Sequence, residues 1–189
     1  KHFQPEEACG NRAFCWYTMA DRFGIPTRLL HWSTSPLIAL YFAIWQLDVT
    51  TPTVWVLNPH ALNKVTLGHN DVFKMDGEDL CDSHQQVHDD YAFGSANLPD
   101  FPIAVANCYT DATINAHRTR YTVSGKRKFG LEDVAKDTEK PILMKIRFGR
   151  SEEFIHQLKS QLSQLGASPQ DITPGIEGIG RAINFEHGL

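Results

Sequence analysis

The chain has 189 residues, of which 42% are apolar and 21% are charged, and its net charge is −4 with histidine neutral. These values are ordinary for a globular protein with one sizeable core, and the negative charge argues against a broad, nonspecific grip on nucleic acid. The longest apolar run, residues 36–45, is too short to cross a bilayer. No secretory leader is visible, so we expect a cytoplasmic protein without membrane contact, whose four cysteines are reduced.

The first elements in chain order are two helices joined by an extended segment. Residues 11–22 are expected to form a helix that ends at Gly24, in the position that favours glycine. Residues 25–32 contain a proline and are expected to be extended. A Ser-Pro pair at residues 35–36 then starts a helix that runs to about Gln46. This helix is apolar on every face, which predicts that it is buried on all sides.

The rest of the chain mixes strands and helices without regular alternation. Strands are predicted at residues 53–58, within 112–123, and at 141–148. The polar residues 59–100 are expected to form an irregular excursion. A helix follows Ser151 and ends at Gly166, and residues 176–185 form a last short helix. We therefore expect an α+β fold, a single domain over residues 1–189, with a mixed or antiparallel sheet and a buried central helix.

Polar and aromatic residues crowd the junction between the extended segment and the apolar helix. They are Arg28, His31, Trp32, Ser33, Thr34 and Ser35. In a purely structural interpretation, Ser35 caps the helix, the other hydroxyls satisfy backbone groups, and Trp32 fills the core. In a functional interpretation, Arg28 and the helix N-terminus together attract an anionic ligand, since an unpaired buried arginine is costly. Both interpretations stay open at this point.

The same stretch carries a family resemblance. Residues 19–43, MADRFGIPTRLLHWSTSPLIALYFA, resemble the central signature of the FRG domain family. Later segments at residues 53–59, 114–125 and 154–183 resemble the later parts of that family in the same order. The chain departs from the family pattern at Asp21-Arg22-Phe23 in place of Gln-His-Tyr, at His31 in place of Asp, and at His117 in place of Gln. The Phe-Arg-Gly that names the family does not occur, so we expect an upstream segment to be missing.

A fainter likeness connects this junction with ADP-ribosyltransferases, whose Arg, Ser-Thr-Ser and Glu elements bind and cleave NAD. The likeness implies an ADP-ribosyltransferase-like fold, NAD as substrate, and a nucleic acid or protein acceptor, in a toxin or an antiphage defence effector. It assigns cofactor binding to Arg28, His31, Trp32, Thr34, Ser35, Tyr41 and Phe42, and catalysis to Ser33 and His117. Core packing of the aromatic residues and a structural His117 are the competing interpretations.

Two features weaken the enzymatic interpretation and leave an alternative. The late Glu-x-Glu or Gln-x-Glu string of the transferases is missing after the junction, and Glu132 is equally well explained as the start of a helix. The alternative function is a non-catalytic sensor module of a larger protein that binds a nucleotide or another anion. The sequence leaves the oligomeric state open.

Two weaker patterns concern metals and nucleic acid. On a helix, Cys81, His84 and His88 would share one face, with His69 or Asp71 as a further ligand. Zinc is disfavoured because this spacing matches no standard site, and no metal site is assigned. The basic residues 118–128, with Tyr121 among them, could contact a nucleic acid, but a solvated hairpin tip explains them better in a chain of negative charge.

Overall fold

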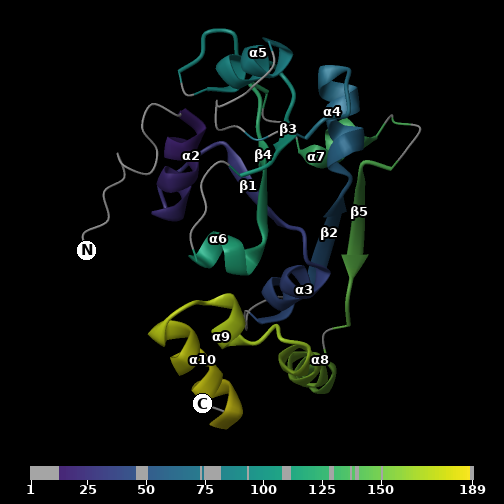
Figure 1. The fold of residues 1–189 in the computed structure, drawn as a ribbon. Helices are drawn as coiled ribbons and strands as arrows, with labels where there is room; N and C mark the ends of the chain where they lie inside the picture. The colour runs from purple at the N-terminus through teal and green to yellow at the C-terminus, as the bar shows by residue number, and fades with distance from the viewer. Residues whose placement is uncertain are drawn as a thin grey trace, which may run out of the picture. The chain divides into compact units, whose positions relative to one another are not determined.

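The computed structural model describes residues 13–45, 51–72, 74, 82–92, 94–107, 112–127, 130–136, 138, 141–149 and 151–187. Its helices are α2 (Ala13–Arg22), α3 (Pro36–Trp45), α4 (Pro59–Leu67), α5 (Asp82–Tyr91), α6 (Ala112–His117), α7 (Leu131–Ala135), α8 (Glu152–Gln164), α9 (Pro169–Ile172) and α10 (Ile176–His187). The strands are β1 (Leu29–Ser33), β2 (Thr53–Leu57), β3 (Ile103–Val105), β4 (Thr119–Val123) and β5 (Leu143–Arg147). Helices and strands are mixed, which confirms the α+β fold (Figure 1).

The chain divides into two compact units, although no linker in the sequence marks the division. Unit 1 comprises Lys1–Trp32, Leu57–Thr110 and Arg120–Leu143, and unit 2 comprises Ser33–Val56, Asp111–Thr119 and Met144–Leu189. The strands form a three-stranded sheet of order β1-β4-β3 and a two-stranded sheet of β2 and β5. The junction singled out in the sequence therefore contributes residues to both units, and each unit is described by itself.

The core of unit 1 lies on one face of the β1-β4-β3 sheet. Strands β3 and β4 are antiparallel, with Ile103 opposite Val123 and Val105 opposite Tyr121. These four residues are at most 3% exposed and pack with Phe14 of α2 and Tyr91 of α5. Because successive strand residues point to opposite faces, Ala104 joins a second cluster with Leu62 and Ile142.

The outer edge of this sheet, strand β3, is capped by the side chain of Asn63. Asn63 of α4 is fully buried, and its amide accepts a hydrogen bond from the Ala104 nitrogen and donates one to the Ala104 oxygen, at 2.7 and 2.8 Å. A third bond, at 2.6 Å, runs from the Asn63 amide nitrogen to the Asp71 carbonyl. Peptide groups of an edge strand need such partners when water is excluded.

The core of unit 2 is made by α3, α8 and the segment that leads into α9. Ile38, Tyr41 and Ile44 follow one face of α3 and pack with the buried residues Leu162, Ala167 and Ile172. The prediction that α3 is buried on all sides is wrong, because Phe42 keeps 45% of its surface exposed. A helix that packs through positions i, i+3 and i+6 leaves its remaining positions available.

Two predicted segments differ from the structure. Residues 59–100, expected to be irregular, contain α4 and α5. The signals for α4 are visible in the sequence, because the Asn58 side chain caps it, Pro59 follows, and Gly68 ends it with φ +82°. His117, expected on a strand, is the last residue of α6 and precedes β4.

The other predicted elements are confirmed. Helix α2 ends before Gly24, whose φ is +74° and whose amide bonds the Asp21 carbonyl. Strands β2 and β5 lie where the sequence places them, and α8 begins after Ser151, whose hydroxyl accepts a hydrogen bond from the Phe154 nitrogen. Gly166 follows α8 with φ +77°.

Two expectations from composition concern cysteines and membranes. Cys15 is fully buried and disulfide-bonded, which contradicts the expectation of reduced thiols for this residue. The other three cysteines lie outside the described residues. Among the described helices, none has the length and apolar character needed to span a bilayer.

Two glycines of α10 give a matched test of the packing in unit 2. A Cβ on Gly178 would overlap the Thr173 carbonyl oxygen, whereas a Cβ on Gly180 would meet nothing within 4 Å. Gly178→Ala is therefore expected to lower the free energy of unfolding by about 1–3 kcal/mol, and Gly180→Ala to raise it by up to about 1 kcal/mol. Urea denaturation measures both. Equal effects of the two changes would contradict the packing of α10 described here.

Candidate functional site

The residues proposed from the sequence fall into two groups. Arg28, His31 and Trp32 belong to unit 1. Unit 2 holds the remaining members: Ser33, Thr34, Ser35, Tyr41, Phe42 and His117. Consecutive residues of the junction therefore serve different units, and the contacts within each unit decide what each side chain can do.

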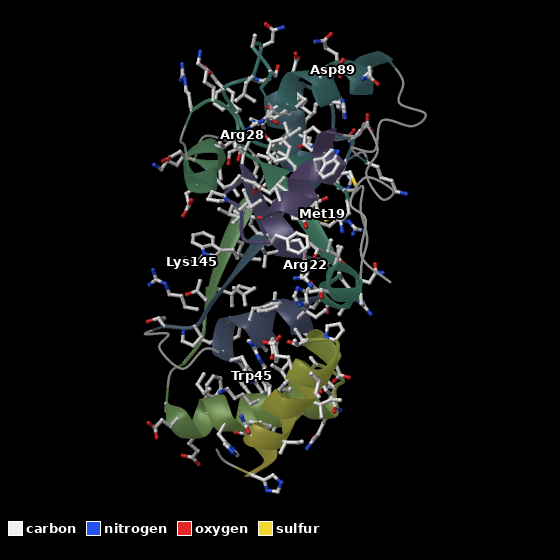
Figure 2. All side chains as sticks on the ribbon, turned by 90° about the vertical axis from the view of Figure 1, so that its left-hand side faces the viewer. Met19, Arg22, Arg28, Trp45, Asp89 and Lys145 are labelled. Atoms are coloured by element: carbon white, nitrogen blue, oxygen red, sulfur yellow. The ribbon has the colours of Figure 1, made fainter. Side chains whose placement is uncertain are left out.

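The guanidinium of Arg28, which is labelled in Figure 2, donates hydrogen bonds to several groups of unit 1. Its Nε and Nη2 donate to the Tyr17 hydroxyl at 3.2 and 2.9 Å, and Nη1 donates to the Ser124 carbonyl at 2.8 Å. Nη2 also reaches the Tyr91 and Ala92 carbonyls, at 2.7 and 3.4 Å, at the C-terminal end of α5. A cation at a helix C-terminus is favourable. In the described structure Arg28 therefore serves the fold.

His31 lies in direct contact with Asp21, the last-turn carboxylate of α2. The Nε2 atom of His31 bonds one Asp21 oxygen, and the Thr27 hydroxyl donates to the other at 3.3 Å. The imidazole also packs edge-on against Tyr121, with ring centroids 4.9 Å apart. The His31 side chain is 51% exposed, and the Asp21 side chain is 16% exposed. Two of the departures from the family pattern thus form one pair.

Trp32, the third member of the first group, is partly buried. Its indole Nε1 donates a hydrogen bond to the Thr122 hydroxyl of β4 at 3.2 Å. This contact joins β1 to β4 on the face of the sheet that carries Ala104, because Thr122 lies opposite Ala104 in the strand register. The indole nitrogen is therefore used within the sheet, as expected for a tryptophan at the edge of a core.

The hydroxyls of the junction fasten it to residues 117–118 in unit 2. The Ser33 hydroxyl donates to the His117 carbonyl at 2.7 Å and accepts from the Ser35 amide at 3.1 Å. The Thr34 amide donates to the Arg118 carbonyl at 3.1 Å. Arg118 has φ +49°, a left-handed conformation that is uncommon for a residue with a side chain. The hydroxyls brace this constrained turn.

Phe42 and His117 form the exposed part of the second group. Their rings meet edge to face, with centroids 4.9 Å apart and an interplanar angle of 82°. The Nε2 atom of His117 lies 3.0 Å from the Ile172 carbonyl, which requires that this nitrogen carry a proton and donate. His117 is thus held twice: its imidazole bonds the Ile172 carbonyl, and its own carbonyl accepts a hydrogen bond from the Ser33 hydroxyl. Phe42 presents an aromatic surface to solvent beside it.

Sequence reasoning missed Trp45 and Lys159, to which ring contacts lead from Phe42 through the buried Tyr41. Tyr41 meets Phe42 edge-on at 5.4 Å and stacks on Trp45 at 4.6 Å, with an interplanar angle of 20°. The Lys159 ammonium of α8 lies 5.1 Å from the Trp45 ring centroid. Burial lowers the pKa of Lys159 from its ordinary value. The sequence signal that could have pointed to Lys159 is its place beside Leu158, at the edge of the apolar face of α8.

The metal and nucleic-acid patterns gain no support in the described part of the chain. No group of three metal-ligating side chains gathers among the described residues, and Cys81 lies outside them. His88 contacts Asp89 at 3.1 Å and packs on Phe14. Of the basic stretch 118–128, Arg127 is paired with Asp100 at 2.9 Å.

The comparison with known proteins supports one part of the chain. The family model of the FRG domain matches residues 1–50, which confirms the resemblance seen in the sequence for this segment. The matched segment includes the junction and all of α3 but ends before His117. No curated protein and no solved structure matches the chain.

The role of Arg28 can be tested by a conservative change. Arg28→Lys keeps the charge but loses the planar donor fork, so it is expected to lower the free energy of unfolding by about 2 kcal/mol. Arg147→Lys, at an exposed position of β5, is the control and is expected to change stability by less than about 0.5 kcal/mol. Urea denaturation of both variants provides the comparison. An unchanged stability for Arg28→Lys would show that the guanidinium is not a structural hub.

The contact between Asp21 and His31 predicts a rescue. His31→Asp alone introduces the residue usual in the family but places two carboxylates together, and should cost about 1 kcal/mol or more. Adding Asp21→Gln, also usual in the family, removes the repulsion and should recover most of that loss. Thermal unfolding of the two single variants and the double variant measures the coupling. Simple additivity would mean that the two positions are independent.

Proposed function

We propose that unit 2 binds a nucleotide at Phe42 and His117, with NAD as the ligand to test first. The observation that carries the proposal is the Phe42 ring, 45% exposed and packed edge-on against an imidazole at 4.9 Å. Exposed aromatic faces stack on nucleobases and on nicotinamide, because every such ring offers a π surface. The surrounding contacts already keep both rings in place, so these two side chains would lose little conformational entropy when a ligand binds.

The neighbouring backbone favours the same interpretation. Ser33 and Thr34 bond the carbonyl groups at 117 and 118, and so hold the end of α6 beside the start of α3. A residue with a side chain in the left-handed region is costly by about 1–3 kcal/mol, and such residues concentrate at binding and catalytic sites. The hydroxyls therefore act as positioning groups for His117.

ADP-ribosyl transfer is the second candidate function. The observation that favours it is the Ser33–His117 contact, which joins the two residues assigned to catalysis across 84 positions of sequence. In this reaction the bond from the ribose C1′ to the nicotinamide nitrogen breaks, and nicotinamide leaves with the electron pair. An acceptor oxygen or nitrogen then bonds C1′, and His117 takes the proton that the acceptor loses. Binding without transfer is preferred because no late Glu-x-Glu string follows the junction.

Calorimetry with NAD tests the binding proposal. Phe42→Ala removes the stacking surface and is expected to weaken NAD binding about tenfold or more, given about 1–3 kcal/mol for one stacked base. Phe154→Ala, which removes a phenylalanine of 37% exposure from α8, is the control and should bind as the parent does. Absence of NAD binding to the parent, or equal weakening by both changes, would contradict the proposal.

Nicotinamide release separates the two functions in the same samples. Release by the parent chain that disappears in Ser33→Ala would establish cleavage of NAD, and labelled ADP-ribose recovered on the acceptor rather than on water would establish transfer. Binding of NAD without release, in the presence of nucleic-acid and protein acceptors, would establish a sensor. Folding of Ser33→Ala is checked by its unfolding midpoint, because loss of one backbone contact is expected to cost about 1 kcal/mol.

A further inference from the structure

We propose that Lys159, Arg181 and Tyr41 of unit 2 form a phosphate-binding site at the far end of the series of ring contacts that begins at Phe42. The inference deepens the proposed function, on which it rests for the identity of the bound base. The three side chains come from α3, α8 and α10, and the ligand chemistry they suit is that of a nucleotide phosphate or of free pyrophosphate.

Lys159 is a partly buried cation without an anionic partner. Its ammonium lies 5.1 Å from the Trp45 ring centroid, and among the described residues no carboxylate pairs with it. Burial already lowers its pKa, which reflects the cost of keeping this charge away from water. An arriving anion would remove that cost. Lys145, also placed over a tryptophan, lies on an exposed strand position 4.6 Å from the Trp55 ring centroid.

Tyr41 brings a buried hydroxyl to the same cluster. The residue is 2% exposed, and its hydroxyl has no hydrogen-bond partner of ordinary geometry among the described residues. Burial raises the pKa of Tyr41, and the charge of the Arg181 guanidinium and its hydrogen bonding toward the Tyr41 oxygen partly offset this rise. A buried O–H without an acceptor is uncommon in native proteins, and a bound oxygen atom would satisfy it.

The balance of charge at the cluster is positive. Arg181 donates to Glu177 at 2.7 Å, which neutralises part of its charge but uses one of its five N–H groups. Lys159 is then a cation that no carboxylate of the described residues pairs with. Ser163, one turn along α8 on the side of Lys159, has a second buried hydroxyl without a hydrogen-bond partner among the described residues. Ammonium, guanidinium and hydroxyl donors together suit a group with several oxygens, such as a phosphate.

A series of ring contacts connects this cluster to the proposed base site. The contacts run from His117 to Phe42, to the buried Tyr41 and to Trp45, which is labelled in Figure 2, and Trp45 packs on Phe185 of α10 with ring centroids 5.0 Å apart. One ligand could therefore place its base on Phe42 and a phosphate near Lys159.

Pyrophosphate binding tests the site without a nucleotide. Calorimetry and thermal unfolding use sodium pyrophosphate at constant ionic strength set with potassium chloride. The parent chain and Lys145→Gln are expected to bind and to gain thermal stability, Lys159→Gln to bind at least tenfold more weakly, and Lys159→Arg to retain binding. Tyr41→Phe should weaken binding several-fold while keeping the unfolding midpoint. Absence of binding to the parent, or equal weakening by both glutamine variants, would overturn the inference.

The Phe42→Ala variant separates this inference from the proposed function. If pyrophosphate binds this variant and the parent equally while NAD binds neither, the phosphate site stands and nucleotide binding fails. If NAD binding depends on Phe42 but not on Lys159, nucleotide binding stands and the phosphate site at Lys159 is overturned. If Lys159→Gln weakens both ligands and Phe42→Ala weakens only NAD, both are supported.

Discussion

The hydrogen bonds of the Arg28 guanidinium are the constraint on which unit 1 depends most. They join the residue that precedes β1 to Tyr17, to the end of α5 and to Ser124, across sequence separations of 11, 63 and 96 residues. Closing the loops between such distant residues costs conformational entropy, and the hydrogen bonds of Arg28 help to offset that cost. A guanidinium can supply them because it offers several donors in one plane, and the carbonyl at a helix end is a favourable acceptor.

The junction therefore separates into a structural part and an accessible part. Arg28 and Ser33 spend their donors on groups of the chain, whereas Phe42 keeps much of its ring in solvent. In the sequence these residues look alike as candidates, because residue type alone does not distinguish a donor that binds a carbonyl from one that binds a ligand. The partners, which come from distant segments, decide the role.

The elements that could be predicted are those with local signals, and the site depends on signals that are not local. Strand β2 and helix α8 follow from composition and capping. Helix α4 has equally local signals in Asn58, Pro59 and Gly68, but it lies in a polar stretch whose composition alone favours irregular structure. The FRG signature drew attention to Phe42 and Ser33, and folding brings both to His117. Neither the burial of Lys159 nor the division into two units leaves a local pattern.

The contact between Asp21 and His31 changes how the departures from the family pattern are weighed. Counted along the sequence, a histidine in place of aspartate and an aspartate in place of glutamine are two separate losses. In the structure they meet, and the imidazole donates to the carboxylate that α2 brings to β1. A hydrogen bond between these positions is compatible with either pair of residues, since a glutamine amide can donate to an aspartate as an imidazole does here. The two departures therefore meet in one contact of unit 1, and they leave the contacts of Phe42 and His117 in unit 2 untouched.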